Sequence, residues 1–303
     1  MNHLRLPKAM HTGVLAAGLP DENEYLRMDQ RADETIRALA TPFPKTCRAY
    51  QLLMQDARMT AHWEMSNYLT VGKLKYNDHG PIHARVTGAY AMQLMRYLLD
   101  ARAPFDVIES AAGDADDACL VSLVAVMMHD IGNSLHRTGH EALSVVLAQP
   151  LLQEWLCSIY PDTMQRTLIQ NFILAAIQCH DIHPPPLYME GAVVAVADGC
   201  DMTKGRARMP IDLGKLDIHG VSALAIEDVV IHPLPGDAPV EIEVRTSNSA
   251  GIFQVEETLV RKLNVTPLKD YVVVSITAVD PNSATEKRIF TNATTVNGQL
   301  RAM

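Results

Sequence analysis

Residues that could bind a metal ion are concentrated in the middle of this chain. Seven of the twelve histidines lie between residues 79 and 183, and a long apolar run ends in His129-Asp130. A carboxylate at the end of such a run must be protonated, paired or bound to a metal, because burying an isolated charge is costly. Neighbours on a helix point about 100° apart, but both side chains could reach an ion beyond the last turn. The alternative is a core histidine capped by an aspartate.

Further ligand-type residues stand where other predicted helices begin or end. They are His79 and His83 at the start of one helix, His136 and His140 after the His-Asp pair, His180 before three prolines, and Asp198 at the end of an apolar run. Histidines four residues apart share one face of a helix. Gly132 is predicted to end the helix before it in the left-handed conformation that favours glycine. Several helices would therefore deliver His or Asp to a common place.

This ordered set resembles the HD superfamily of metal-dependent phosphohydrolases over about residues 76–208. The resemblance implies six metal ligands, which are His83, His129, Asp130, His140, His180 and Asp198. His136 is left open as a replacement for His140. No Gly-Tyr-Pro follows His180-Asp181, so the similarity to the cyclic-dinucleotide HD-GYP branch is partial. His79 lies where that branch has an additional metal-binding Glu.

The predicted chemistry is hydrolysis of a phosphate ester. Imidazole and carboxylate ligands suit one or two divalent ions per chain, with Fe, Mn, Ni, Co or Zn expected and Mg possible, and Asp130 could bridge two ions. Such ions lower the pKa of water from about 15.7 to roughly 7 and stabilise attacking and leaving oxygens. A metal-activated hydroxide would cleave a phosphomonoester, nucleotide or cyclic phosphodiester. Catalytic candidates are Asp130, His79 and, as general acid, His183; His183 could instead be an ordinary exposed histidine.

A charged substrate would also need donor groups from the protein. The candidates are Lys204, Arg206 and Arg208 after the last Asp, Arg85 near the first His, and Asn133 as a neutral donor. Cations of this kind bind phosphate strongly when several converge. The alternative for the basic cluster is a solvated helix end, since isolated surface charges specify little.

Composition favours a cytoplasmic protein that acts on a small molecule. The formal net charge of −9 argues against an extended nucleic-acid footprint or an anionic membrane surface as the main partner. The five cysteines show no Cys-x-x-Cys spacing, as expected in a reducing compartment. No apolar stretch approaches the roughly 20 residues of a membrane span.

The pattern predicts a mainly α-helical HD body followed by a small α+β domain. Predicted units are an N-terminal arm and helix over residues 1–45, an all-α metal-binding domain over 46–216 and a ββαββ domain over 217–303. Helices are expected around 46–71, 81–101, 117–131, 139–150, 151–157, 163–179, 191–203 and 250–263, and strands around 223–231, 240–244, 271–279 and 288–295. The acidic segment 109–117 is interpreted as a solvated turn. An open sheet leaves edges, so a homodimer is expected.

Two other functions fit the same residues. Four His and two Asp also resemble the ligand set of HD-type di-iron oxygenases. The third possibility is a metal-containing sensor or scaffold without turnover, in which the sheet domain binds an effector.

Overall fold

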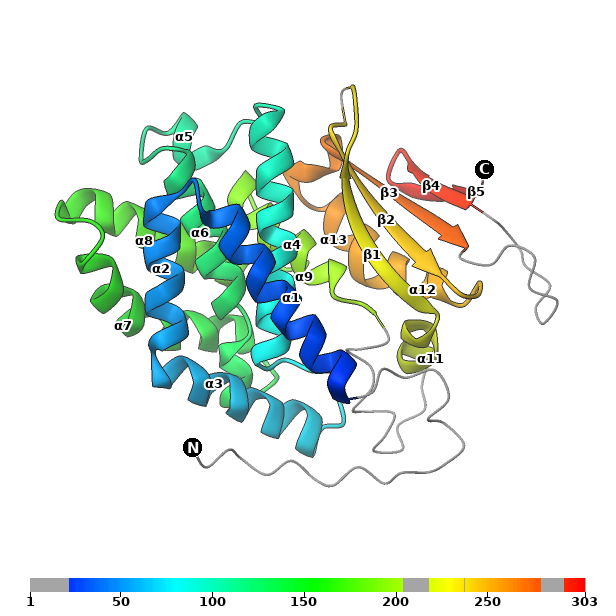
Figure 1. Cartoon of the computed structure of the whole chain (residues 1–303), viewed down its shortest axis with the longest axis horizontal. Helices are drawn as coiled ribbons and strands as arrows, with labels where there is room; N and C mark the ends of the chain where they lie inside the picture. Colours follow the sequence, from blue (N-terminus) through cyan, green and yellow to red (C-terminus); the bar gives the residue numbers. More distant parts are fainter. Residues whose placement is uncertain (1–21, 204–217, 237, 279–291, 303) are drawn as a thin grey trace.

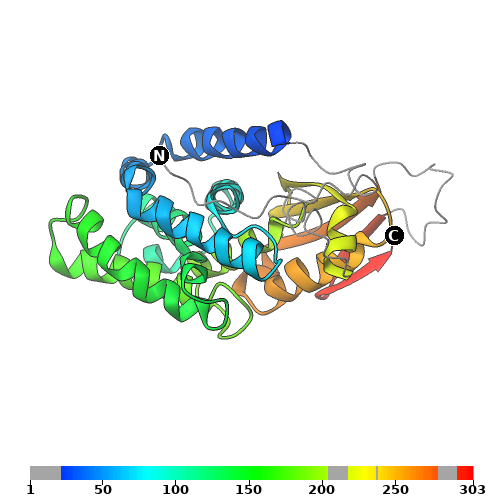
Figure 2. The same cartoon turned by 90° about the horizontal axis from the view of Figure 1, so that it is seen from below.

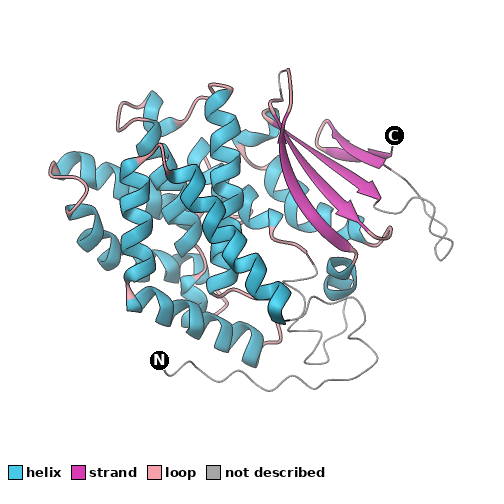
Figure 3. Cartoon of the chain, viewed as in Figure 1, coloured by secondary structure: helices cyan, strands magenta, loops and turns pink. Residues whose placement is uncertain are grey.

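The computed structural model describes residues 22–203, 218–236, 238–278 and 292–302. Within these residues a helical body is followed by a mixed sheet, which confirms the predicted fold class (Figures 1 and 3). Residues 1–21 of the N-terminal arm and helix predicted over residues 1–45 lie outside the described residues, as does the domain boundary predicted near residue 216.

The helical body is built around α6. Its helices are α1 (Glu22–Ala40), α2 (Pro44–Gln55), α3 (Ala57–Asn67), α4 (Pro81–Asp100), α5 (Asp106–Glu109), α6 (Ala115–Met128), α7 (His140–Cys157), α8 (Thr163–Gln178) and α9 (Met189–Cys200), with a π-helical turn η1 (Tyr68–Lys73) and a 3-10 turn η2 (Ile131–Ser134). Every α6 residue from Asp116 onward is buried, and α2, α4, α8 and α9 contact this helix. A helix that is apolar on all sides belongs in a core, so α6 fixes the position of whatever follows it.

Two predicted helix boundaries are wrong. The single helix expected over residues 46–71 is broken at Asp56, whose extended backbone ends α2 and whose side chain caps α3 by accepting a hydrogen bond from Arg58 N at 2.8 Å. Conversely, the two helices expected on either side of Pro150 form one helix, α7. Pro150 is exposed, so a carbonyl deprived of its N–H partner there can be solvated.

The acidic segment before α6 is not the solvated turn that we predicted. Asp114 caps α6, and both Asp116 and Asp117 are buried. The Asp116 carboxylate accepts hydrogen bonds from Lys45 N at 2.8 Å and Thr46 N at 2.9 Å, at the start of α2. The first N–H groups of a helix lack partners within it, so this carboxylate ties the two helix beginnings together.

The described C-terminal residues form a five-stranded sheet with a helical crossover. Its elements are α11 (Ile218–Leu224), β1 (Ile226–Pro233), β2 (Val240–Thr246), α12 (Gly251–Gln254), η3 (Val255–Val260), α13 (Arg261–Asn264), η4 (Pro267–Asp270), β3 (Val272–Ala278), β4 (Asn292–Val296) and β5 (Gln299–Ala302). The strand order is β1-β2-β3-β4-β5 with β2 and β3 parallel. Parallel neighbours need a long connection, which α12, η3 and α13 provide as one continuous helix.

The prediction missed strand β5. Asn297 and Gly298 both have positive φ, 51° and 74°, and join β4 to β5 as a two-residue hairpin turn. An Asn-Gly pair is the strongest short signal for such a turn. Residues 223 and 224, predicted as strand, belong to α11.

The sheet unit packs directly on the helical body. The crossover helix contacts α9, and β1 contacts α4, where the Tyr90 hydroxyl donates a hydrogen bond to Val229 O at 3.3 Å. Figure 2 shows the two parts side by side, with the orange crossover helix below the sheet in that view. In the described part of the chain, no helix is long and apolar enough to cross a membrane.

Candidate metal centre

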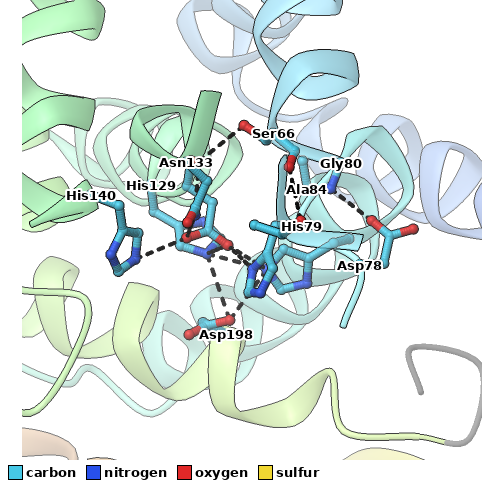
Figure 4. A network of polar contacts seen from close by, with 12 residues as sticks. Ser66, Asp78, His79, Gly80, Ala84, His129, Asn133, His140 and Asp198 are labelled. Carbon is cyan, nitrogen blue, oxygen red and sulfur yellow. Dashed lines mark hydrogen bonds and ion pairs between the residues drawn. The ribbon is translucent and has the colours of Figure 1, made fainter. Parts of the chain in front are cut away.

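Ligand-type side chains from five segments of the helical body meet at the end of α6. His83 lies in the first turn of α4, His129 and Asp130 follow α6, His140 begins α7, His180 follows α8, and Asp198 lies in the last turn of α9. Each side chain is at most 13 % exposed. Figure 4 shows His129, His140 and Asp198 pointing toward one another from different elements. The tertiary structure therefore gathers the six residues that the sequence predicted as ligands.

Four of their atoms form a compact first group. His83 Nε2 and His129 Nε2 are 3.2 Å apart. Asp198 Oδ1 lies 3.3 Å from His83 Nε2 and 3.6 Å from His129 Nε2. Asp130 Oδ2 lies 3.3 Å and 3.2 Å from the same two nitrogens. Ligands bound about 2.1 Å from one ion are separated from each other by roughly 3.0–3.4 Å, so the spacing of the first group fits a divalent ion.

The other carboxylate oxygen of Asp130 belongs to a second group. Asp130 Oδ1 lies 3.1 Å from His140 Nε2 and 3.9 Å from His180 Nε2, and the two nitrogens are 3.2 Å apart. Asp130 thus presents one oxygen to each group. A carboxylate that does this can hold two ions beside each other.

Hydrogen bonds at the far side of the rings fix which nitrogen carries the proton. His129 Nδ1 lies 2.6 Å from Val126 O, and His180 Nδ1 lies 2.7 Å from Ile177 O. A carbonyl only accepts, so each Nδ1 carries a proton, and whenever the ring is neutral its Nε2 points a lone pair into the cluster. His83 Nδ1 lies 2.6 Å from Asp201 Oδ2, a contact of the kind that orients metal-binding histidines. Converging lone pairs and carboxylates require a cation, so the donor set fits bound metal ions.

Charge and burial act in opposite directions on the two aspartates. Burial by itself would raise the pKa of Asp130, but the neighbouring His129 and His79 hold it well below its ordinary value. Burial would also raise the pKa of Asp198, but the Lys262 ammonium and the neighbouring imidazoles hold it well below its ordinary value. Both carboxyls are therefore ionised. Burial, with His129 and His140 nearby, lowers the pKa of His180 well below its ordinary value, so that ring is neutral and able to bind a metal.

His79 and Asn133 hold Asp130 in place. His79 Nδ1 lies 2.6 Å from Asp130 Oδ2, and His79 with His83 and Asp130 forms a further set of closely spaced ligand atoms. Asn133, predicted to contact substrate, donates its side-chain amide to Asp130 Oδ1 at 2.8 Å. Its observed contact is therefore with the Asp130 carboxylate.

Gly132 does not end α6 in the left-handed conformation that we predicted. It lies in η2, and its φ is not among the positive values of the described glycines. A Cβ atom at this position would lie 2.1 Å from His140 O and 2.5 Å from Ser144 N. The glycine is needed because α7, which carries His140, passes against the chain just after Asp130.

A cavity of about 410 Å³ opens onto the cluster. His79, Asp130, His140, His180 and Asp198 line it from the helical body, and Glu257, Thr258, Arg261 and Lys262 line it from the crossover helix of the sheet unit. Arg137 also lines it, with Nη1 lying 3.3 Å from Asn133 Oδ1 and 3.2 Å from His140 Nε2. The site is therefore formed between the two parts of the molecule.

Other predicted site residues lie elsewhere. Arg85 pairs with Asp29 of α1. His136 is exposed and its Nδ1 accepts a hydrogen bond from Thr138 N, so His140 and not His136 approaches Asp130. His183 is exposed and is not among the residues that line the cavity. The predicted phosphate-binding residues Lys204, Arg206 and Arg208 lie outside the described residues.

Sequence reasoning missed three residues of the site. Arg137 stands seven residues after Asp130, and Asp201 stands three residues after Asp198, so both were close to recognised motifs. Lys262 is more than sixty residues from the last predicted metal ligand, Asp198, in the helix predicted over residues 250–263. Its only local signal is a charge between the buried Val260 and Leu263.

Comparisons with known proteins give one informative relative. No family model matches the chain, and no solved structure matches it. The chain is 38 % identical to the uncharacterized protein MJ1020 of Methanocaldococcus jannaschii over 226 residues, a region that covers 74 % of this chain and 86 % of the relative. This extent of similarity includes most of both proteins, and the chain belongs to the same family as MJ1020.

Proposed function

We propose that the protein is an HD-type phosphohydrolase that uses two divalent metal ions. The observation that carries this proposal is the position of Asp130, whose two oxygens face separate groups of imidazole and carboxylate atoms at the floor of a cavity. His83, His129 and Asp198 would hold one ion, and His140 and His180 the other. Two ions at such a site lower the pKa of water and stabilise negative charge on the attacking and leaving oxygens.

The cavity favours a small anionic substrate. Arg137 is about one third exposed and stands beside the second group, where its guanidinium could donate two hydrogen bonds to a phosphate. A volume of about 410 Å³ suits a small molecule, and the residues lining the cavity include no Phe, Tyr or Trp in the described part of the chain. We therefore favour a compact phosphomonoester over a substrate that needs its base stacked on an aromatic ring.

The test begins with the metal content of the full chain, purified without chelator and then loaded with manganese, iron, cobalt, nickel or zinc. We expect about two ions per chain and release of phosphate from a panel of small phosphomonoesters. Nucleotides and cyclic phosphodiesters form the comparison panel. Metal binding without turnover on any phosphate ester would contradict the hydrolase and favour the scaffold.

Arg137→Gln separates substrate binding from metal binding. Losing one charge-assisted contact to phosphate should lower kcat/KM by roughly 10- to 100-fold while the metal content stays that of the wild type. Arg96→Gln is the matched control, because Arg96 is exposed on α4, where it pairs with Asp100 at 2.8 Å. Each assay is run in air and anaerobically, since turnover that consumes oxygen would favour the oxygenase instead.

A further inference from the structure

One cation of the C-terminal unit reaches the metal-ligand cluster. The ammonium group of Lys262, in α13, contacts Asp198 Oδ2 and donates a hydrogen bond to His180 O at 3.0 Å. The Lys262 side chain is 11 % exposed. Asp198 belongs to the first group of ligands and His180 to the second, so this ammonium links one member of each group.

The neighbouring backbone allows this contact. A Cβ atom at Gly199 would lie 2.8 Å from Thr258 O and 3.3 Å from Leu259 Cα. Glycine next to Asp198 therefore lets the crossover helix approach α9 closely enough for Lys262 to reach the carboxylate. The close packing at Gly199 and the ion pair between Lys262 and Asp198 thus both join α9 to the crossover helix.

We propose that Lys262 is a positioning residue for the metal centre, and that the C-terminal unit is consequently required for tight metal binding. Its ammonium group binds Oδ2 of Asp198 and leaves Oδ1 directed at His83 Nε2 and His129 Nε2. Its bond to His180 O fixes the backbone that presents the His180 ring to the second group. The inference rests on the proposed metal site and not on the reaction catalysed there.

The experiment measures affinity for manganese and zinc, by competition with a chelator, in the full chain and in Lys262→Met. Methionine keeps an unbranched stem and removes the charge and the donors. Changing a residue that orients metal ligands typically weakens binding by about 10- to 100-fold, and we expect a loss in this range. Lys269→Met, on the exposed surface of the same unit, is the matched control and should bind both metals like the wild type.

Three results are decisive. Wild-type affinity in a folded Lys262→Met would overturn the inference, whether or not the protein hydrolyses phosphate esters. If Lys262→Met does not fold, judged by circular dichroism, Lys262→Arg and Lys262→Gln replace it. Arginine keeps the charge and should bind metal more tightly than glutamine; equal affinities would also overturn the inference. A wild-type protein that binds no metal would instead refute the metal centre and the proposed function together.

Discussion

The two ends of α6 carry buried carboxylates that the protein treats differently. At the start of the helix, Asp116 and Asp117 meet N–H groups of α2, the Lys45 ammonium and the Tyr160 hydroxyl. Just after its end, Asp130 meets a ring of imidazoles. The partial charge of a helix is positive at its start and negative at its end, so the first position favours a carboxylate and the second opposes it. At the start of α6 the buried carboxylates therefore hold the fold together. After the end of α6 the buried carboxylate needs neighbouring cations to balance its charge.

The largest expected effect is at Asp130. Asp130→Ala removes an oxygen from each ligand group, so both ions and all metal-dependent activity should be lost, while the far-ultraviolet circular dichroism stays close to that of the wild type. Elemental analysis and activity assays on the same preparation check this prediction. Retained metal in this variant would remove the contrast between the two ends of α6.

The reverse result is expected at the other end of the helix. Asp117→Ala leaves the Tyr160 hydroxyl and Lys45 without a carboxylate that now lies 2.5 Å and 2.7 Å away. Breaking a buried charged contact in this way should lower the free energy of unfolding by about 3–5 kcal/mol, as measured by urea denaturation. The metal content of the folded fraction should remain that of the wild type. Loss of metal without loss of stability would contradict the structural role.

The buried carboxyl of Glu190 has fewer hydrogen-bond partners than that of Asp117. It is fully buried, and its Oε1 accepts one hydrogen bond from Val107 N at 2.9 Å. Burial raises the pKa of Glu190 from 4.5 to about 7. Because the unfolded chain releases this proton at lower pH, the contribution of Glu190 to stability falls as the pH rises from about 4.5 to 7 and stays low above that.

Glu190→Gln should therefore gain stability relative to the wild type as the pH rises. Between pH 4.5 and 8 the free energy of unfolding of the variant should rise by about 3 kcal/mol relative to that of the wild type. Denaturant unfolding at a series of pH values measures this change. Glu109→Gln, on an exposed residue, is the control. A difference that is independent of pH would show that Glu190 titrates normally.

The smallest effect is expected at Asp114. Its Oδ1 accepts hydrogen bonds from Asp116 N and Asp117 N at 3.0 Å and 3.1 Å. Asp114→Ala removes this helix cap and should cost about 1 kcal/mol in thermal or urea unfolding. A cost as large as that of Asp117→Ala would mean that the cap, and not the buried carboxylates, holds the two helix beginnings together.

The sequence by itself determined the helical body, the sheet unit and the residues that converge on Asp130. Apolar runs fixed which helices are buried, and His or Asp at their ends had few energetically acceptable environments. It misjudged two local breaks, because Asp56 ends α2 and caps α3, whereas Pro150 is tolerated within α7 at an exposed position. It also took Asp116 and Asp117 for solvated residues, since their partners are on α2 and after α7.

Only the tertiary structure decided what completes the centre. Spacing could not choose between His136 and His140: His140, the first residue of α7, is buried beside Asp130, whereas His136, in the segment before α7, is exposed. Lys262 could not be assigned from its own segment, because its partner Asp198 is 64 residues away and meets it only where the crossover helix packs on α9. Local sequence specifies which side chains must be buried, but contacts between distant segments decide which charges meet, and here those contacts join the sheet unit to the metal-ligand cluster.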